Sequence, residues 1–467
     1  MALVGAGVST SARGGLTRLS WAAKGGHEAV VKMLLERDDV DPNIADTHGE
    51  TPLLIAAREG YEGVVKVLLE RNDVNSNIAD RHGETPLLIA AHEGYEGVVK
   101  VLLERNDVNS NIADRHGETP LLIAACEGYE GVVKVLLERN DVNSNIADRN
   151  GEAPLLIAAC GGYEGVVKVL LERNDVSPNI ADRHGETPLL IAAREGYEGV
   201  VKVLLERNDV NSNIADRHGE TPLPIAAREG YEGIVKVLLE HDFSPNITDR
   251  YGETPLLLAA RGGHEGILKV LLERNDVNCN TTNQHGQTPL FIAASKGHEG
   301  VAKMLLERHD VNPNTAGDDG KADTWIASGL VREVIIKWLR GCNDFIFSQT
   351  PLSIAAWGGH EGIVKMLLKR NDVNPNTAES GGKTPLYMAA WGGREGVVKM
   401  LLERNDVNCN TANLHGQTPL MVAASNGHEA VVKMLLGRAD VNSDIIDVAG
   451  KTALSKAQKR RHRPIIK

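Results

Sequence analysis

The sequence predicts an all-α solenoid, in which short helix–turn–helix units joined by turn-rich fingers stack in one direction. The first observation is a repeat of 34 residues. Its opening Thr-Pro-Leu begins at Thr51, Thr85, Thr119, Thr187, Thr221, Thr254, Thr288, Thr350, Thr384 and Thr418, with weaker copies at Thr17, Ala153 and Thr452. The second is that 467 residues hold only five Trp, eight Tyr and four Phe, so Leu, Val, Ile and Ala must form the core.

The first helix of a unit follows from the stretch that begins at Thr51. Thr51 is a favourable N-cap, and Pro52 suits the first helical position because an N–H there has no partner within the helix. Residues 53–57 then form a short helix with a face of small residues. Gly60 ends it, since glycine readily takes the left-handed conformation of a helix stop.

A second helix is predicted from about Tyr61 to Arg71, with Val and Leu on one side and charged residues toward water. Asn77–Glu84 is rich in turn-forming residues and leads to the next Thr-Pro-Leu. A single unit cannot bury its apolar face alone, so neighbouring units must stack.

The residues distinguish between two families with 34-residue repeats. Tetratricopeptide units carry large aromatics at fixed helical positions, which this chain lacks. The sequence instead resembles the ankyrin repeat family, on the pattern Asp-Arg-His-Gly-Glu-Thr-Pro-Leu (80–87), Ala90-Ala91, Gly94, Val98-Val99-Lys100, Leu102-Leu103 and Asp107-Val108-Asn109. This pattern recurs about a dozen times over some 430 residues. The resemblance implies an ankyrin-repeat solenoid of helix–turn–helix units with β-turn fingers.

The chain departs from the family pattern at two positions. The family usually has His after Thr-Pro-Leu, bonded back to the Thr, whereas here Leu54 and its equivalents stand there. One extra residue also lies beside the junction of helix and finger, as in Arg71–Asp73. At single repeats, Ala153 lacks the cap, at a cost of about 1 kcal/mol, and Pro224 is tolerable because it falls in the first helical turn.

The repeats divide the chain into four predicted segments. Residues 1–16 form an N-terminal extension, and residues 17–321 a block of about nine repeats. Residues 322–349 are an eroded repeat, which a hinge, an apolar contact site, decay or an error in the gene model would each explain. Residues 350–467 form a second block that ends in a truncated, basic C-terminal cap.

The resemblance implies a binding surface on the concave face, which finger tips and the ends of the first helices form in this family. Repeats Thr51–Glu84 and Thr187–Glu220 are identical, and neighbouring copies differ mainly at the helix end, while Lys66 and its equivalents on the opposite side do not vary. Unconstrained drift is the competing explanation. We predict that the partner-binding residues are Arg58, Arg81, His82, His92, Arg194, Arg228, Arg261, Trp357 and Trp391.

Trp357 and Trp391 occupy the helix-end position of adjacent repeats. Adjacent helices pack about 8–10 Å apart, so the two indoles could form one aromatic patch. Trp is also enriched among interface hot spots. The alternative is that each Trp covers only its own repeat.

Composition and motifs exclude several classes of function. A net charge of -12 argues against a general nucleic-acid binder, and no apolar run is long enough to insert in a membrane. The five cysteines cannot form a disulfide framework, which points to a reducing, cytoplasmic setting. Histidines such as His48 and His82 lie one repeat apart, too far to share a metal. Because no catalytic motif is present either, we expect no enzyme activity, no metal and no cofactor.

The sequence therefore predicts a monomeric protein-interaction scaffold or adaptor. The alternative is the recognition arm of a larger multidomain signalling receptor. The basic tail, Lys459–Arg463, suits a polar C-terminal cap; a nuclear-import signal is the alternative, which would extend the localisation to the nucleus.

Overall fold

The computed structural model describes residues 16–241, 243–317, 349–460 and 462–466. The chain divides into two compact units, Met1–Pro222 (unit 1) and Leu223–Lys467 (unit 2). Each is described by itself.

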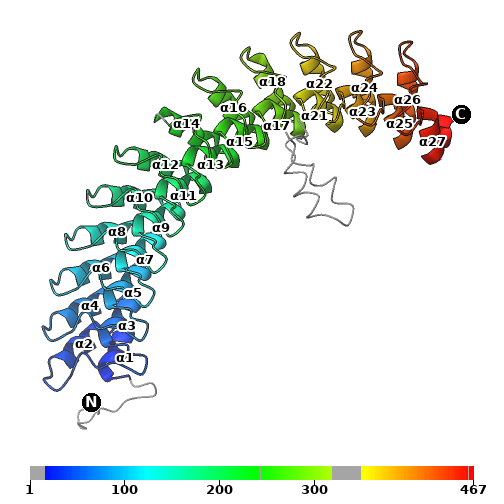
Figure 1. The fold of residues 1–467 in the computed structure, drawn as a ribbon. Helices are drawn as coiled ribbons and strands as arrows, with labels where there is room; N and C mark the ends of the chain where they lie inside the picture. Colours follow the sequence, from blue (N-terminus) through cyan, green and yellow to red (C-terminus); the bar gives the residue numbers. More distant parts are fainter. Residues whose placement is uncertain (1–15, 242, 318–348, 461, 467) are drawn as a thin grey trace. The chain divides into compact units, whose positions relative to one another are not determined.

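Unit 1 consists of paired helices in two rows. In Figure 1 the first helices of the repeats follow one another on one side and the second helices on the other. Each first helix packs on the next first helix, and each second helix on the next second helix. The helices are α1 (Arg18–Lys24), α2 (Glu28–Leu35), α3 (Pro52–Arg58), α4 (Glu62–Leu69), α5 (Pro86–His92), α6 (Glu96–Leu103), α7 (Pro120–Cys126), α8 (Glu130–Leu137), α9 (Pro154–Cys160), α10 (Glu164–Leu171), α11 (Pro188–Glu195) and α12 (Glu198–Leu205).

Unit 2 has the same two rows, and α13 begins at its boundary. Its helices are α13 (Pro222–Glu229), α14 (Glu232–Glu240), α15 (Pro255–Gly262), α16 (Glu265–Leu272), α17 (Pro289–Lys296), α18 (Glu299–Glu307), α21 (Pro351–Gly358), α22 (Glu361–Leu368), α23 (Pro385–Gly392), α24 (Glu395–Leu402), α25 (Pro419–Asn426), α26 (Glu429–Leu436), α27 (Ala453–Arg460) and α28 (Arg463–Ile466). The residues described contain no strand, only one isolated bridge between Gly317 and Gln349. The predicted all-α class is confirmed.

The predicted start and stop signals of the first helix are confirmed. The Thr51 hydroxyl accepts a hydrogen bond from the Leu54 amide at 3.3 Å, and Pro52 begins α3. Gly60 has a φ of +76°, and a Cβ there would lie 3.0 Å from the ring of Tyr95 in the next repeat. Only glycine therefore fits both the turn and the packing at this position.

The repeats with unusual residues keep the same helices. Ala153 provides no side-chain cap, but α9 still begins at Pro154, and α13 forms with Pro224 in its first turn. Leu54, at the position where the family usually has His, is fully buried. Apolar burial in the core therefore takes the place of the missing His–Thr hydrogen bond.

The second helix is shorter than predicted, because the chain leaves it to form a contact between repeats. In the second repeat α4 ends at Leu69, and Arg71 forms a two-pronged ion pair with Asp73, with Nε to Oδ1 at 2.8 Å. Arg71 Nη1 also donates to the carbonyl of Leu35, the last residue of α2, at 3.0 Å. The extra residue at this junction thus places an arginine over the carboxyl end of the preceding helix, where a cation is favoured.

This Arg–Asp fork recurs along both units. Hydrogen bonding to Arg105 lowers the pKa of Asp107, and the same bond raises the pKa of Arg105. The other forks are Arg37–Asp39, Arg139–Asp141, Arg173–Asp175, Arg207–Asp209, Arg274–Asp276, Arg308–Asp310, Arg370–Asp372, Arg404–Asp406 and Arg438–Asp440.

In most repeats an asparagine near the start of the finger forms a second connection between repeats. Asn111 Nδ2 donates to the Asp141 carbonyl at 2.7 Å, and Asn111 Oδ1 accepts from the Asn143 amide at 2.8 Å. Both bonds go to the next repeat. Asn77 makes the same pair of bonds one repeat earlier. The amide side chain therefore satisfies backbone groups that the neighbouring repeat cannot satisfy itself.

The repeats on either side of residues 318–348 stack directly on each other. The first helices α17 and α21 pack together, as do the second helices α18 and α22. Asn314 Nδ2 reaches the carbonyl of Asp372 at 2.7 Å, which is the bond that asparagine makes between adjacent repeats elsewhere. Gly317 and Gln349 exchange two backbone hydrogen bonds of 2.9 Å. The stack therefore continues across the long step between Thr288 and Thr350.

Gly317 and Gln349 occupy the finger positions that Asn283 and Gln287 occupy one repeat earlier. Three residues separate Asn283 from Gln287, whereas residues 318–348 separate Gly317 from Gln349. The additional residues thus enter the chain at a finger tip. Apart from Gln349, the eroded repeat 322–349 lies outside the described residues, as does the predicted extension 1–16 apart from Leu16. Their roles stay predictions.

We predict that Asn111→Ala lowers the free energy of unfolding by about 1–2 kcal/mol, because two hydrogen bonds to the next repeat are lost. Urea unfolding measures the change. Asn106→Ala is the matched control, since Asn106 is an exposed residue of the same repeat whose side chain forms no hydrogen bond with the described residues. Equal effects of the two substitutions would show that the asparagine connection does not stabilise the stack.

We also predict that replacing residues 318–348 by Gln-His-Gly, the residues between Asn283 and Gln287, leaves stability within about 0.5 kcal/mol. The replacement restores the 34-residue step and still lets Gly317 pair with Gln349. Thermal unfolding provides the measurement. The control joins Gly317 directly to Gln349, which prevents their pairing and should destabilise the protein. A marked loss of stability in the Gln-His-Gly variant would mean that the segment contributes to the stack.

Candidate functional site

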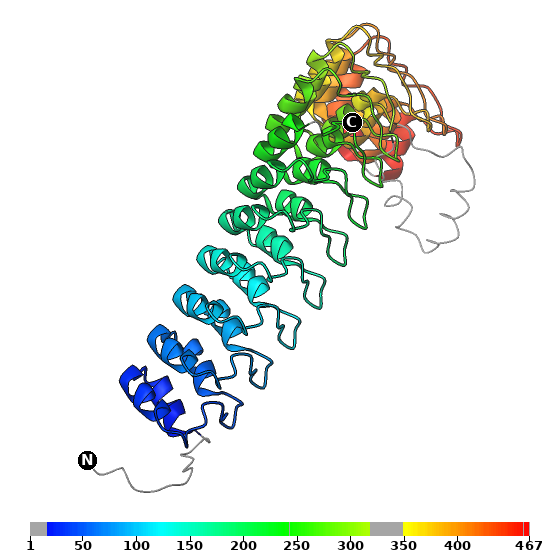
Figure 2. The ribbon, with the colours of Figure 1, turned by 90° about the vertical axis from the view of Figure 1, so that its left-hand side faces the viewer.

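Each finger of unit 1 is closed by an aspartate, which directs two side chains outward. Asp80 Oδ1 accepts hydrogen bonds from the amides of His82 at 2.7 Å and Glu84 at 3.0 Å. The Asp80 amide donates to the Glu84 carbonyl at 3.0 Å, and Gly83 has a φ of +87°. Arg81 and His82 are exposed at the tip. Figure 2 shows the loops of unit 1 projecting to one side of its helices.

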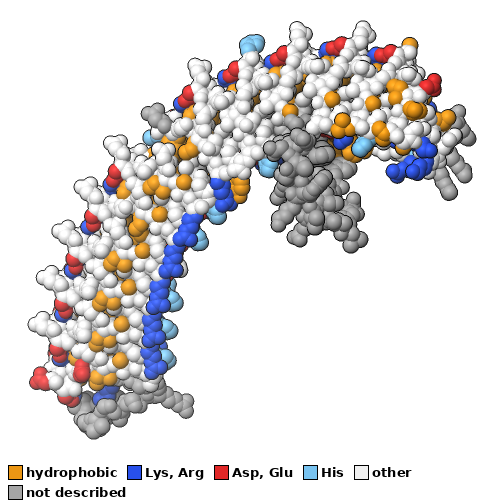
Figure 3. Space-filling model, viewed as in Figure 1, with side chains coloured by type: hydrophobic (Ala, Val, Ile, Leu, Met, Phe, Trp, Pro, Cys, Tyr) orange, Lys and Arg blue, Asp and Glu red, His pale blue; other side chains and the backbone are white. Residues whose placement is uncertain are grey.

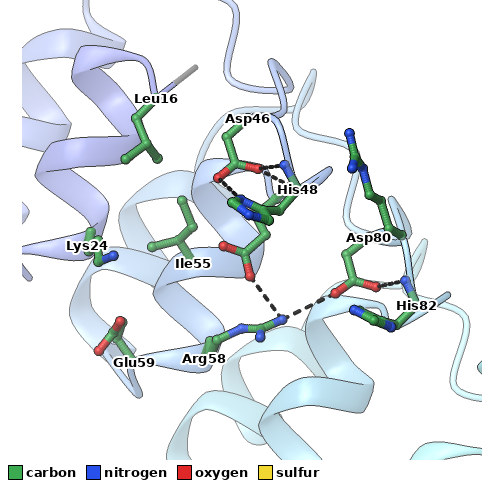
Figure 4. Close-up of a pocket in the computed structure, with 11 residues that line it drawn as sticks. Leu16, Lys24, Asp46, His48, Ile55, Arg58, Glu59, Asp80 and His82 are labelled. Atoms are coloured by element: carbon green, nitrogen blue, oxygen red, sulfur yellow. Dashed lines mark hydrogen bonds and ion pairs between the residues drawn. The ribbon is translucent and has the colours of Figure 1, made fainter. Parts of the chain in front are cut away.

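Arg58 lies at the end of α3, between two fingers. Its Nη2 atom is 3.1 Å from Glu50 Oε1 in the finger before α3, and 3.3 Å from Asp80 Oδ2 and 3.6 Å from Glu84 Oε2 in the finger after it. Figure 4 shows the guanidinium directed toward Asp80. The side chain is 38% exposed. Arg58 therefore neutralises finger carboxylates and still reaches the surface.

Three of the predicted site residues meet in one surface hollow. Arg58, Arg81 and His82 line it together with residues of the preceding finger, including His48 and Glu50. His92 is exposed at the equivalent helix end one repeat further along unit 1. The structure thus brings together the helix-end and finger-tip positions that the sequence analysis combined into one face.

The other helix-end arginines also contact carboxylates. Arg194 contacts Glu186, and its Nη2 atom lies 3.5 Å from Asp216 Oδ2. In unit 2, Arg261 contacts Glu253, and Arg228 Nε donates to Glu229 Oε1 at 3.1 Å. This second role of the helix-end arginines was not predicted from the sequence. The constant spacing of the finger Asp and Glu around a variable helix-end residue was the signal that could have shown it.

Cys126 and Cys160 stand where Arg58 stands in the second repeat, and both are exposed thiols that form no disulfide. The three carboxylates that Arg58 contacts have equivalents two repeats later, beside Cys126. They are Glu118, Asp148 and Glu152. Burial and the neighbouring aspartates raise the pKa of both Glu118 and Glu152. Because no arginine stands at the helix ends of these repeats, the carboxylates around Cys126 lack the positive charge that Arg58 provides in the second repeat.

Burial raises the pKa of the Cys126 thiol, and nearby carboxylates, Glu127 first among them, raise it further. The same two causes raise the pKa of the Cys160 thiol. A raised pKa favours the thiol over the nucleophilic thiolate. The shift therefore does not favour these two thiols as nucleophiles. Their position at the helix ends makes them part of the same surface as Arg58.

Trp357 and Trp391 lie half-exposed at the ends of α21 and α23, which pack together. The Trp391 ring meets the ring of Tyr387 edge-on at 6.4 Å, and Lys383 Nζ lies 5.1 Å from its centroid. Burial raises the pKa of Tyr387 to about 12. Its hydroxyl donates to Gln417 Oε1 at 3.2 Å. A shared patch of the two indoles stays a prediction.

The described part of the chain contains no group of three or more His, Cys, Asp or Glu placed to hold a metal ion. No helix within that part is long and apolar enough to cross a membrane. The finger tips and helix ends form a polar surface that extends over several repeats, with aromatic residues in unit 2. Such a surface can bind a partner through several repeats at once.

Comparison with known proteins gives a consistent family. The family model "Ankyrin repeats (3 copies)" matches residues 2–80, 72–148, 105–182, 139–214, 155–249, 242–316 and 326–413, and "Ankyrin repeats (many copies)" matches residues 400–457. Among curated proteins, no match was found.

Two similar solved structures are ankyrin repeat proteins. The ankyrin repeat domain of Bcl-3, described as a unique member of the IkappaB protein family, is 23% identical; the match covers 49% of this chain and all of that one, with a TM-score of 0.44. EF0377, an ankyrin repeat protein, is 30% identical; the match covers 40% of this chain and 96% of that one, with a TM-score of 0.39.

We predict that Cys126→Arg raises the free energy of unfolding by about 0.5–1 kcal/mol at pH 7, the range of partly exposed ion pairs. The new guanidinium can contact the carboxylates as Arg58 does. Because the pKa values of Glu118 and Glu152 are raised, these groups are unfavourable in the fold when ionised. The gain should therefore shrink as the pH falls through their pKa values and they become protonated.

Urea unfolding between pH 3.5 and 7 measures this gain. Cys126→Gln is the control, because it lengthens the side chain without adding charge. An equal gain in stability from Cys126→Gln, or a gain that does not depend on pH, would show that ion pairs with these carboxylates do not cause the stabilisation.

Proposed function

We propose, because the chain belongs to the ankyrin repeat family, that it is a non-enzymatic scaffold that binds a protein partner across its finger face. The finger face is the surface formed by the exposed finger-tip residues and the residues at the ends of the first helices. Ankyrin repeats are generally protein–protein interaction modules, and proteins built from them are typically non-enzymatic. No comparison supports the alternative of a receptor arm.

The observation that carries the proposal is where near-identical repeats differ. Repeats Thr51–Glu84 and Thr85–Glu118 differ only in Arg58 and His92, both at the helix end. The next copy adds Cys126 at the same position and Asn150 at a finger tip. Exposed lysines of the second helix, such as Lys100, stay the same in these copies. Variation on one exposed side and not the other favours a binding surface.

The contacts of the helix-end arginines decide how the proposal can be tested. Arg58 and Arg194 hold finger carboxylates, so reversing their charge would destabilise the fold as well as change the surface. A loss of binding in such a variant would not separate the two effects. His92 is exposed and forms no ion pair with any described residue, which makes it a better probe of the same surface.

We predict that a photo-activated crosslinking side chain at position 92 forms a discrete adduct with one protein when the full chain is expressed in cells. The same side chain at position 100 is the control, because Lys100 is exposed on the second helix of the same repeat. An adduct from position 92 only, competed by unlabelled chain, supports the proposal. Equal adducts from both positions, or none from either, would contradict it.

A further inference from the structure

The finger tips of unit 1 carry a row of exposed arginines, one in each of the five successive repeats that follow the first. They are Arg81, Arg115, Arg149, Arg183 and Arg217. In Figure 3, Lys and Arg side chains form a row along one edge of unit 1, with His side chains beside them. We call these five residues the arginine row.

Contacts between fingers hold the arginine row in place. The Arg115 amide donates to the His82 carbonyl at 3.3 Å, and the Arg149 amide donates to the His116 carbonyl at 3.2 Å. The stem of Arg115 lies over Gly83, where a Cβ would be 3.4 Å from Arg115 Cγ. The backbone and the first side-chain carbons of these arginines are therefore held against the preceding finger. The spacing between neighbouring arginines is then the spacing between neighbouring repeats.

The guanidinium groups of most of the row have no partner within the described residues. Arg81, Arg115, Arg149 and Arg217 take part in no side-chain hydrogen bond or ion pair there. Arg183 differs, because its Nη2 atom donates to the Arg149 carbonyl. The neighbouring aspartates form no ion pair with these four arginines within the described residues. Asp114 Oδ1, for example, is taken by the amides of His116 and Glu118, both at 2.8 Å.

From this row we infer the chemistry of the partner that the proposed function requires. Neighbouring helices, and so neighbouring repeats, lie about 8–10 Å apart. A polyproline II segment rises about 3.1 Å per residue and turns once in three residues, so every third side chain falls on the same side about 9 Å apart. We propose that the arginine row binds an extended acidic segment of a protein, with Asp or Glu at every third residue.

A nucleic acid fits the same row less well. In double-stranded DNA each strand carries one phosphate per about 3.4 Å of helix axis, so most of its phosphates would face no arginine of the row. Behind the tips lie Glu118 and Glu152, which no helix-end arginine covers, and the chain as a whole has a charge of -12. A peptide with one acid in three can place its charges on the arginines and its other residues elsewhere.

The test uses the full chain and a synthetic peptide with Asp-Pro-Ala repeated five times, which favours polyproline II. We expect saturable binding that weakens as salt rises, since exposed charges are screened at higher ionic strength. Changing Arg81, Arg115, Arg149 and Arg217 to Gln should weaken binding by about tenfold or more, as four exposed ion pairs are lost. Fluorescence anisotropy measures the affinity, and thermal unfolding checks that the variant is folded.

Two controls separate the arrangement of charge from its amount. Changing the exposed second-helix residues Lys66, Lys100, Lys134 and Lys168 to Gln makes the same change in net charge and should leave binding within about twofold. A peptide of the same composition with its Asp residues grouped together should bind less tightly. Equal affinity for both peptides, or equal losses in both variants, would overturn the proposal.

A single-stranded oligonucleotide of thymidines tests the nucleic-acid reading. Binding as tight as that of the spaced peptide, lost in the four-arginine variant, would overturn the proposal in favour of nucleic acid. The outcomes are distinct from those of the proposed function. If the crosslinked partner still binds the four-arginine variant with unchanged affinity, the acidic segment is wrong while the scaffold function stands.

Discussion

The fold depends on hydrogen bonds that each repeat makes for its neighbour. The last carbonyl of α2, on Leu35, is bound by Arg71 of the following repeat, and the carbonyl of Asp107 is bound by Asn77 of the preceding one. In an isolated repeat these backbone groups, and one side of each helix, would be exposed to water. Because the bonds run in both directions, they favour a constant step along the chain, and this explains why most repeats keep the 34-residue spacing, with a 33-residue step between Thr221 and Thr254.

The same constraint shows where the chain tolerates change. Between Thr288 and Thr350 the extra residues enter at a finger tip, where the two ends, Gly317 and Gln349, lie side by side. The helices and the asparagine bond on both sides keep the geometry of adjacent repeats. A finger tip points away from the stack, so the length of chain there does not alter the step between helices.

Electrostatics divides the surface into two parts with different roles. Arg58 and Arg194 at the helix ends form ion pairs with finger carboxylates of the same chain, so much of their positive charge is neutralised within the fold. The finger-tip arginines, such as Arg115, are anchored by backbone and stem but keep their charge toward water. A chain with a net charge of -12 thus presents a local row of positive charge, and such local patterns determine which partners approach and in what register.

Much of the fold could be predicted because its signals are local and repeated. The Thr51 cap, Pro52 and the left-handed Gly60 each act within a few residues, and their recurrence identified the repeat family and the finger face. Contacts that join residues about 22 to 60 positions apart, such as Arg58 with Asp80 or Asn314 with Asp372, could not be predicted. Residue type alone does not show which of several carboxylates or carbonyls lies nearby. Only the stacking of the repeats decided that the helix-end arginines are compensated and the finger-tip arginines are not.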